Sequence, residues 1–190
     1  MLNLFRHLLL CLAMVLLGAC ASRSAVDLRG LQPATTVDLA RYMGRWHVIA
    51  HIPYLAENGK VGTYVEYVPR ADGKIDDYYY FRKRNFAADI QRWEGYGWVI
   101  PGTGNAVWKT RFVWPLTVDY VILEVDPDYR WALVGHPKRT LAWVFHREPQ
   151  IDPGLYADLL GRLKGHGFDP QALRRIPQSR EQLGQAGFTE

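Results

Sequence analysis

The side chains that could carry covalent or metal chemistry are few in this chain of 190 residues. The two thiols, Cys11 and Cys20, both lie in the first twenty residues, so the rest of the chain can form neither a disulfide nor a paired-thiol metal site. The G-x-S-x-G and H-E-x-x-H patterns of hydrolases and zinc peptidases are missing from the sequence. We therefore expect a protein that is not an enzyme and that has no cofactor and no metal.

His47 and His51 are the nearest approach to a metal-ligating pair. They belong to an alternating stretch that predicts a strand, and residues four apart on a strand share a face but lie about 13 Å apart. One ion cannot bridge that distance. We expect both imidazoles to be solvated on the outer face of the strand.

Cys20 has a distinctive setting. Arg6 and His7 precede an apolar run over residues 8–17, which is too short for a membrane span and has the length of a signal-peptide core. The run ends in Leu17-Gly18-Ala19-Cys20, where small residues precede the cysteine. An ordinary secretory signal with a chance cysteine is the alternative interpretation.

The tetrapeptide resembles the lipobox of bacterial lipoproteins. The resemblance implies that residues 1–19 are a signal peptide and that the Cys20 thiol carries a lipid. Several acyl chains on one cysteine would give firm membrane anchoring. Because no Asp follows Cys20, the resemblance also favours the outer membrane. The small and polar residues 20–36 would form the lipidated tether.

Charge and composition narrow the partners. The net charge is +4, and removal of residues 1–19 takes away only Arg6, which leaves +3. So mild a charge without a basic run does not support nucleic-acid binding. The chain contains seven Trp and eleven Tyr, which indicates many half-buried strands or a lined cavity.

Eight stretches alternate between apolar and polar residues and are separated by turn residues, which is typical of a β-sandwich or a closed barrel. They cover residues 46–52, 63–68, 74–84, 90–100, 106–114, 120–125, 130–135 and 140–146. A helix should follow from Asp152, because Leu155, Leu159 and Leu163 recur at near-helical spacing. That stripe predicts a helix packed on the outside of the sheet.

Three blocks in order resemble the lipocalin family, specifically bacterial outer-membrane lipocalins. They are Gly44-Arg45-Trp46, the segment from Val118 to Gly135, and Trp143 to Pro149, with Arg147 in the last. The resemblance spans residues 37–178 and leaves 179–190 as a C-terminal tail. Val118 departs from the usual Thr and His47 from the frequent Tyr.

The resemblance implies an all-β fold, an eight-stranded antiparallel up-and-down β-barrel with a C-terminal α-helix packed outside. Trp46 would cover the closed end and Arg147 would lie across its indole face, a structural role. Gly44 would allow the chain to turn tightly into the first strand.

Alternation then predicts which side chains face the interior, with the family comparison deciding the ambiguous third strand. The predicted ligand-binding residues are Ala50, Val65, Tyr67, Asp77, Tyr79, Trp93, Trp108, Phe112, Leu141 and Trp143. Gly95 and Gly97 should leave room inside. Such a lining suits a slender lipophile, although small barrels can also be solid.

Together these features predict a membrane-anchored lipocalin that binds and stores or transports fatty acids or lysophospholipids in membrane maintenance or stress. We expect it on the outer membrane, lipid-anchored and facing the periplasm, and a homodimer is possible. The alternative is a lipocalin-fold enzyme, an isomerase or synthase acting on a small lipophile.

Overall fold

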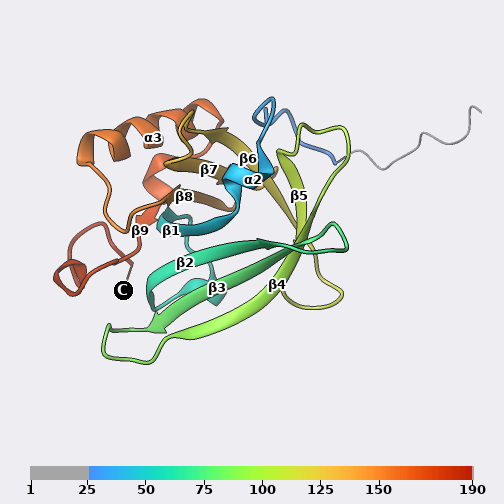
Figure 1. Ribbon diagram of the computed structural model, residues 1–190. Coiled ribbons are helices and arrows are strands. Elements are labelled where there is room, and N and C mark those ends of the chain that lie inside the picture. The colour runs from blue at the N-terminus through green and yellow to red at the C-terminus, as the bar shows by residue number, and fades with distance from the viewer. Residues whose placement is uncertain (1–25, 190) are drawn as a thin grey trace, which may run out of the picture.

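The computed structural model of the chain describes residues 26–189. The predicted signal peptide and the predicted lipidation of Cys20 lie outside the described residues. Within them, one antiparallel sheet closes on itself, because β1 pairs with both β2 and β8. The predicted eight-stranded barrel is confirmed (Figure 1).

The strands follow one another around the barrel in chain order. They are β1 (Gly44–His51), β2 (Lys60–Pro69), β3 (Ile75–Lys83), β4 (Gln91–Val99), β5 (Val107–Arg111), β6 (Val118–Val125), β7 (Trp131–Gly135) and β8 (Ala142–His146). A short additional strand, β9 (Arg174–Arg175), pairs with the end of β1. The sequence did not predict β9, which is too short to show alternation.

The two ends of the barrel differ. At the closed end lie the β2–β3, β4–β5 and β6–β7 loops together with helix α2 (Leu39–Tyr42). The open end consists of the loops over residues 52–59, 84–90, 112–117 and 136–141. The first of these loops contains the 3-10 turn η1 (Leu55–Glu57); η2 (Pro170–Ala172) and η3 (Arg180–Gln182) follow the last long helix.

Helix α3 (Pro153–Gly165) packs on the outside of the barrel, as its leucine spacing predicts (Figure 1). The Asp152 carboxylate accepts a hydrogen bond from the Leu155 amide and caps the helix N-terminus. Leu159 and Leu163 are fully buried in a cluster with the outward side chains of β6, β7 and β8. The barrel therefore has two apolar cores, one inside the sheet and one beneath α3.

A β-bulge in β1 changes the predicted alternation. The register against β8 shifts between Val48 and Ala50, so the residues after the bulge face the opposite way from the expectation. Ala50 consequently lies in the cluster beneath α3 and not inside the barrel. His51 is not solvated; only 1% of its surface is exposed. Both placements correct the sequence analysis.

The N-terminal segment also differs from the expectation. Residues 26–36 were expected to be tether, but they pack along the outside of the barrel. Leu31 is buried, the Ala34 amide donates a hydrogen bond to the Ile122 carbonyl, and the Val37 amide donates one to the Gly104 carbonyl. Residues 26–36 therefore belong to the folded domain and not to a tether.

Candidate functional site

Arg147 seals the closed end of the barrel. Its guanidinium lies 3.6 Å from the centre of the buried Trp46 indole and donates hydrogen bonds to the carbonyls of Arg41 (2.7 Å) and Arg45 (2.6 Å). Such a cation–π contact is worth about 0.5–2 kcal/mol. Gly44 has φ +85°, and a Cβ there would lie 3.7 Å from this guanidinium. The role of Arg147 is structural, because its guanidinium donates these hydrogen bonds to backbone carbonyls.

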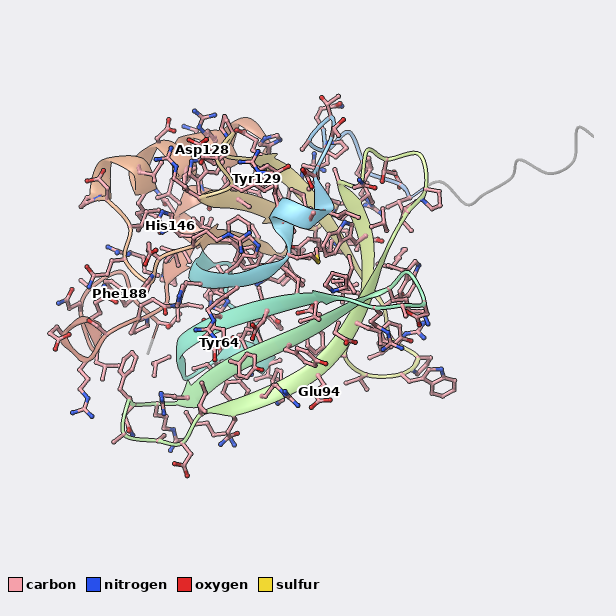
Figure 2. All side chains as sticks on the ribbon, viewed as in Figure 1. Tyr64, Glu94, Asp128, Tyr129, His146 and Phe188 are labelled. Atoms are coloured by element: carbon pink, nitrogen blue, oxygen red, sulfur yellow. The ribbon has the colours of Figure 1, made fainter. Side chains whose placement is uncertain are left out.

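Tyr129 completes the plug from the β6–β7 loop. It lies beside helix α2 (Figure 2), and its hydroxyl accepts a hydrogen bond from the Asp38 amide at 2.7 Å. The Arg41 guanidinium covers its ring at 4.3 Å from the ring centre. The Arg147 side chain also donates to the Tyr129 carbonyl, so loop and helix are held together at the closed end.

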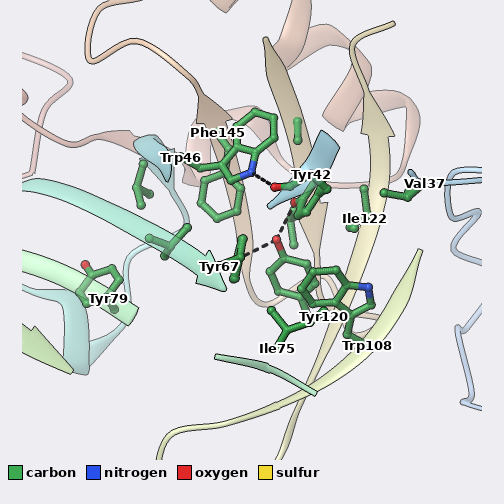
Figure 3. Packing of buried hydrophobic residues seen from close by; sticks show 14 of the residues in the cluster. Val37, Tyr42, Trp46, Tyr67, Ile75, Tyr79, Trp108, Tyr120, Ile122 and Phe145 are labelled. Carbon is green, nitrogen blue, oxygen red and sulfur yellow. Dashed lines mark hydrogen bonds between the residues drawn. The ribbon is translucent and has the colours of Figure 1, made fainter. Parts of the chain in front are cut away.

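Aromatic rings fill the half of the barrel interior nearer the closed end (Figure 3). The Tyr120 hydroxyl lies 2.7 Å from that of Tyr42 and 3.1 Å from that of Tyr67, and the Trp108 ring stacks on Tyr120 with a centroid distance of 5.1 Å. Burial raises the pKa of all three tyrosines, which keeps their hydroxyls protonated and paired. Trp108, a predicted ligand contact, is therefore filling, with its indole N–H donated to the Asn105 carbonyl.

A small cavity of about 60 Å³ remains in the half of the barrel nearer the open end. It has room for only a few water molecules or a short piece of a ligand. The predicted residues that line it are Val65, Tyr67, Asp77, Tyr79, Phe112 and Trp143, together with Val48, Glu57, Tyr120 and Phe145. The structure thus brings most of the predicted lining residues together around a space smaller than an acyl chain.

Asp77 puts a carboxyl group at this cavity. It is 4% exposed, and its Oδ1 has no hydrogen-bond partner among the described residues. Burial, helped by the negative charge of Glu57, raises the pKa of Asp77 to about 7. The Tyr79 hydroxyl is also buried, and it has no hydrogen-bond partner within residues 26–189. Together with the Glu57 carboxylate, these two groups are polar groups that an entering ligand would meet.

The loop over residues 52–59 covers the mouth of the barrel. Its Glu57 turns inward, is 4% exposed, and pairs with the His51 ring through Nδ1. Tyr54 of the same loop packs edge-on against Trp143, with ring centres 6.5 Å apart. Sequence reasoning missed Glu57 and His51, because a glutamate in a loop and a histidine on an outward-facing position both indicate exposure.

Lys60, at the start of β2, is enclosed by aromatic rings at the rim. Its Nζ lies 2.9 Å from the ring centre of Trp93 and 4.0 Å from that of Phe81, with no hydrogen-bond partner in residues 26–189. Burial lowers the pKa of Lys60 to about 8, against the opposing effect of the Glu57 charge. Lys60 is therefore a buried cation whose ammonium group is held by aromatic rings alone.

A wider groove of about 530 Å³ opens beside the rim. Its walls are Tyr54, Ala56, Arg92, Trp93, Glu94, Phe112, Val113, Leu116 and Val118. Phe112 lines both this groove and the inner cavity, so the two spaces adjoin at its ring. Trp93 lines the groove, whereas Leu141 is half-buried and lines neither space.

The two β4 glycines do not leave the predicted room. A Cβ on Gly95 would meet the Phe112 ring at 2.8 Å, and one on Gly97 would lie 3.4 Å from the Thr110 methyl group. Side chains of β5 and of the loop after it therefore already occupy the space over both glycines. The glycines allow close packing of neighbouring side chains instead of enlarging the interior.

Two further features are absent from residues 26–189. No group of three or more His, Cys, Asp or Glu side chains in this range could hold a metal ion. No helix in the same range is both long and apolar enough to cross a membrane.

Residues 37–178 match the family model described as a lipocalin-like domain. The chain belongs to the lipocalin family. Temperature-induced lipocalin-1 of Arabidopsis thaliana is 33% identical over 75% of this chain and 80% of the relative. The outer membrane lipoprotein Blc of Vibrio cholerae is 27% identical over 91% of this chain and 99% of its own length, and that of Escherichia coli K12 is 28% identical over 83% and 87%.

Solved structures support the same fold. Insecticyanin from the tobacco hornworm Manduca sexta has a TM-score of 0.61 at 20% identity, covering 82% of this lipocalin and 88% of that chain. Apocrustacyanin C2 has a TM-score of 0.63 at 13% identity over 83% and 88%. Membership of the family implies that this lipocalin binds a lipophile, since lipocalins are generally binding proteins.

Proposed function

We propose that this lipocalin binds an acyl-chain lipid, a fatty acid or lysophospholipid, with its tail in the half of the barrel nearer the open end and its head at the mouth. The observation that carries the proposal is the Phe112 ring, which lines both the inner cavity and the groove. The groove alone has the size of a small-molecule site, for which about 300–1,000 Å³ is typical. A tail that displaced the Phe112 ring would pass from one space into the other.

The charges favour entry of the tail first. Asp77 and Glu57 lie at the inner cavity and would repel a carboxylate or phosphate there. Arg92 lines the groove at the rim, where its guanidinium, which also pairs with Glu94, could contact an anionic head group. The tail end then meets Asp77, whose neutral form below its pKa of about 7 is the easier one to cover with hydrocarbon.

We also propose that the protein acts at the outer membrane, held by a lipid on Cys20, and that it stores or moves lipids during membrane maintenance or stress. The lipobox-like residues support the anchor, and the bacterial relatives are named outer membrane lipoproteins. The bound lipid would be exchanged with that membrane.

Binding of a bromine-labelled fatty acid and of lysophosphatidylcholine to the chain without its first 20 residues tests the proposal. Quenching of tryptophan fluorescence should saturate, and Phe112→Ser should weaken binding about tenfold by removing the apolar contact that the ring makes with the ligand in both spaces. Leu183→Ser is the matched control, because Leu183 is an exposed apolar residue of the C-terminal segment. Absence of saturable quenching would refute ligand binding, and chemical conversion of the bound lipid would instead support the enzyme alternative.

A further inference from the structure

Exposed apolar side chains concentrate at the open end of the barrel. Residues 26–189 contain ten large apolar side chains that are strongly exposed, and all but Val68 and Leu183 lie at this end. The eight are Leu55, Ile90, Trp93, Phe112, Val113, Trp114, Leu116 and Val118. The closed end has no comparable surface among these residues, so the asymmetry follows the barrel axis.

The most exposed members form a tip on two neighbouring loops, η1 and the β5–β6 loop. Leu55 is 90% exposed, Trp114 79%, Leu116 68% and Val113 64%. The β5–β6 loop over residues 112–117 contains no charged residue. Both loops line the groove beside the rim, and exposed apolar surface of this kind marks an interaction site.

Basic residues lie on other parts of the open end. Arg82 and Lys83 end β3, Arg84 begins the β3–β4 loop, and the β7–β8 loop carries Lys138 and Arg139. Asp89 is the acidic residue of these two loops. An apolar tip with a basic rim complements a membrane surface, where acyl chains lie beneath phosphate head groups.

The N-terminal segment leaves the barrel at the same end. Val26, the first described residue, lines a surface groove with Thr117 of the β5–β6 loop and His136 and Pro137 of the β7–β8 loop. The Arg139 guanidinium holds the segment there by donating a hydrogen bond to the Arg29 carbonyl at 2.9 Å. The chain preceding Val26 therefore begins beside the apolar tip.

The length of that preceding chain limits how the barrel can sit. Six Cα-to-Cα steps separate Cys20 from Val26, which span about 20 Å at full extension. The eight residues of β1, at the tilt usual for barrels, give a barrel height of about 20 Å as well. A lipid on Cys20 thus lets the open end rest on the membrane with slack, whereas the closed end could reach it only with the tether stretched along the barrel.

We propose that the open end of the barrel docks on the bilayer that holds the Cys20 lipid, with Val113, Trp114 and Leu116 inserted among the head groups and upper acyl chains. The proposal rests on the anchor proposed above. In this orientation the groove beside Phe112 faces the lipid surface, and a tail enters the barrel directly from the membrane.

Depth-dependent quenching in vesicles tests the orientation. The full chain is produced in a bacterium, so that the processed protein carries its lipid, and is reconstituted into phosphatidylethanolamine–phosphatidylglycerol vesicles containing doxyl-labelled lipid. A single new cysteine carries a bimane label, either Val113→Cys at the tip or Ala71→Cys in the exposed β2–β3 turn at the closed end. Bimane at Val113→Cys should be quenched at least about twofold more than at Ala71→Cys.

A second variant separates docking from mere proximity. Replacing Trp114 and Leu116 by Ser in the Val113→Cys protein should remove most of that quenching while the protein still floats with the vesicles. Both side chains are exposed, so the fold should tolerate the change. Quenching that is insensitive to the two replacements would overturn the inserted tip.

The remaining outcomes are distinct. Protein that floats with the vesicles but shows equal quenching at Val113→Cys and Ala71→Cys contradicts the orientation and leaves the anchor intact. Protein that fails to float contradicts the anchor and the orientation with it, and lipid binding is measured separately. A tip buried in a second copy would give label-to-label energy transfer that depends on protein density without lipid quenching, and would replace the bilayer with a homodimer.

Discussion

Replacing Asp77 with Asn should flatten the dependence of folding stability on pH between pH 5 and pH 8. The pKa of Asp77 rises from 3.8 to about 7 in the folded barrel, first because it is buried and second because Glu57 is near. The folded protein therefore holds this proton more tightly than the unfolded chain does. The resulting stabilisation is complete below pH 3.8 and is lost as the pH rises through 7.

The size of the effect follows from the two pKa values. The whole difference corresponds to about 4 kcal/mol, of which more than half should be lost between pH 5 and pH 8. The buried position of Asp77 means that solvent screens little of it. Asn at this position cannot ionise, so the variant should lack this part of the loss and be the more stable protein at pH 8.

Urea unfolding followed by tryptophan fluorescence at the two pH values measures the effect. Glu57, His51 and Lys60 are the neighbouring titratable groups, and the comparison of variant with parent isolates the part due to Asp77. Asp76→Asn is the matched control, because its carboxylate lies on the outer face of the same strand and pairs with Arg70. The reasoning would be refuted if Asp77→Asn and the parent lost the same stability between pH 5 and pH 8.

Other substitutions address the remaining parts of the barrel. Arg147→Lys should lower the unfolding free energy by about 2–4 kcal/mol in urea melts, because an ammonium group cannot cover the Trp46 indole and serve several carbonyls together; an unchanged midpoint would argue against the plug. Trp108→Ala should cost about 3–5 kcal/mol by cavity formation, whereas Trp93→Ala should weaken ligand binding with little change in stability; equal stability losses would contradict the division between filled base and open mouth. Glu57→Ala should cost about 1–3 kcal/mol by removing the partner of a buried imidazole and should accelerate ligand dissociation in stopped-flow measurements; an unchanged dissociation rate would show that the loop does not restrain the ligand.

Local pattern was sufficient for most of the fold. On β2 the alternation of Val65 and Tyr67 with the half-buried Tyr64 and Glu66 is the burial that the structure shows. The spacing of Leu159 and Leu163 likewise predicts the buried face of α3. Both predictions concern regular backbone, where the period of the sequence and the direction of the side chain are tied by geometry.

The site was less accessible because its geometry depends on contacts between distant segments. Ile49 and Ala50 are both apolar, so nothing in β1 reveals the bulge that moves Ala50 outside and His51 inside. The burial of Glu57 in turn depends on His51. Trp108 is filling and not lining because Tyr42 enters the base from α2, a packing relation that strand alternation cannot express.

The filled base of the barrel sets how long a ligand stays. Because the rings of Tyr42, Tyr67, Trp108 and Tyr120 occupy the half nearer the closed end, the barrel is a shallow cup in which only part of an acyl chain can be buried. Each methylene group left outside forgoes about 0.8 kcal/mol, which shortens residence about fourfold if association is unchanged. A cup of this depth favours rapid exchange over sequestration, so we expect a short residence time for the bound lipid.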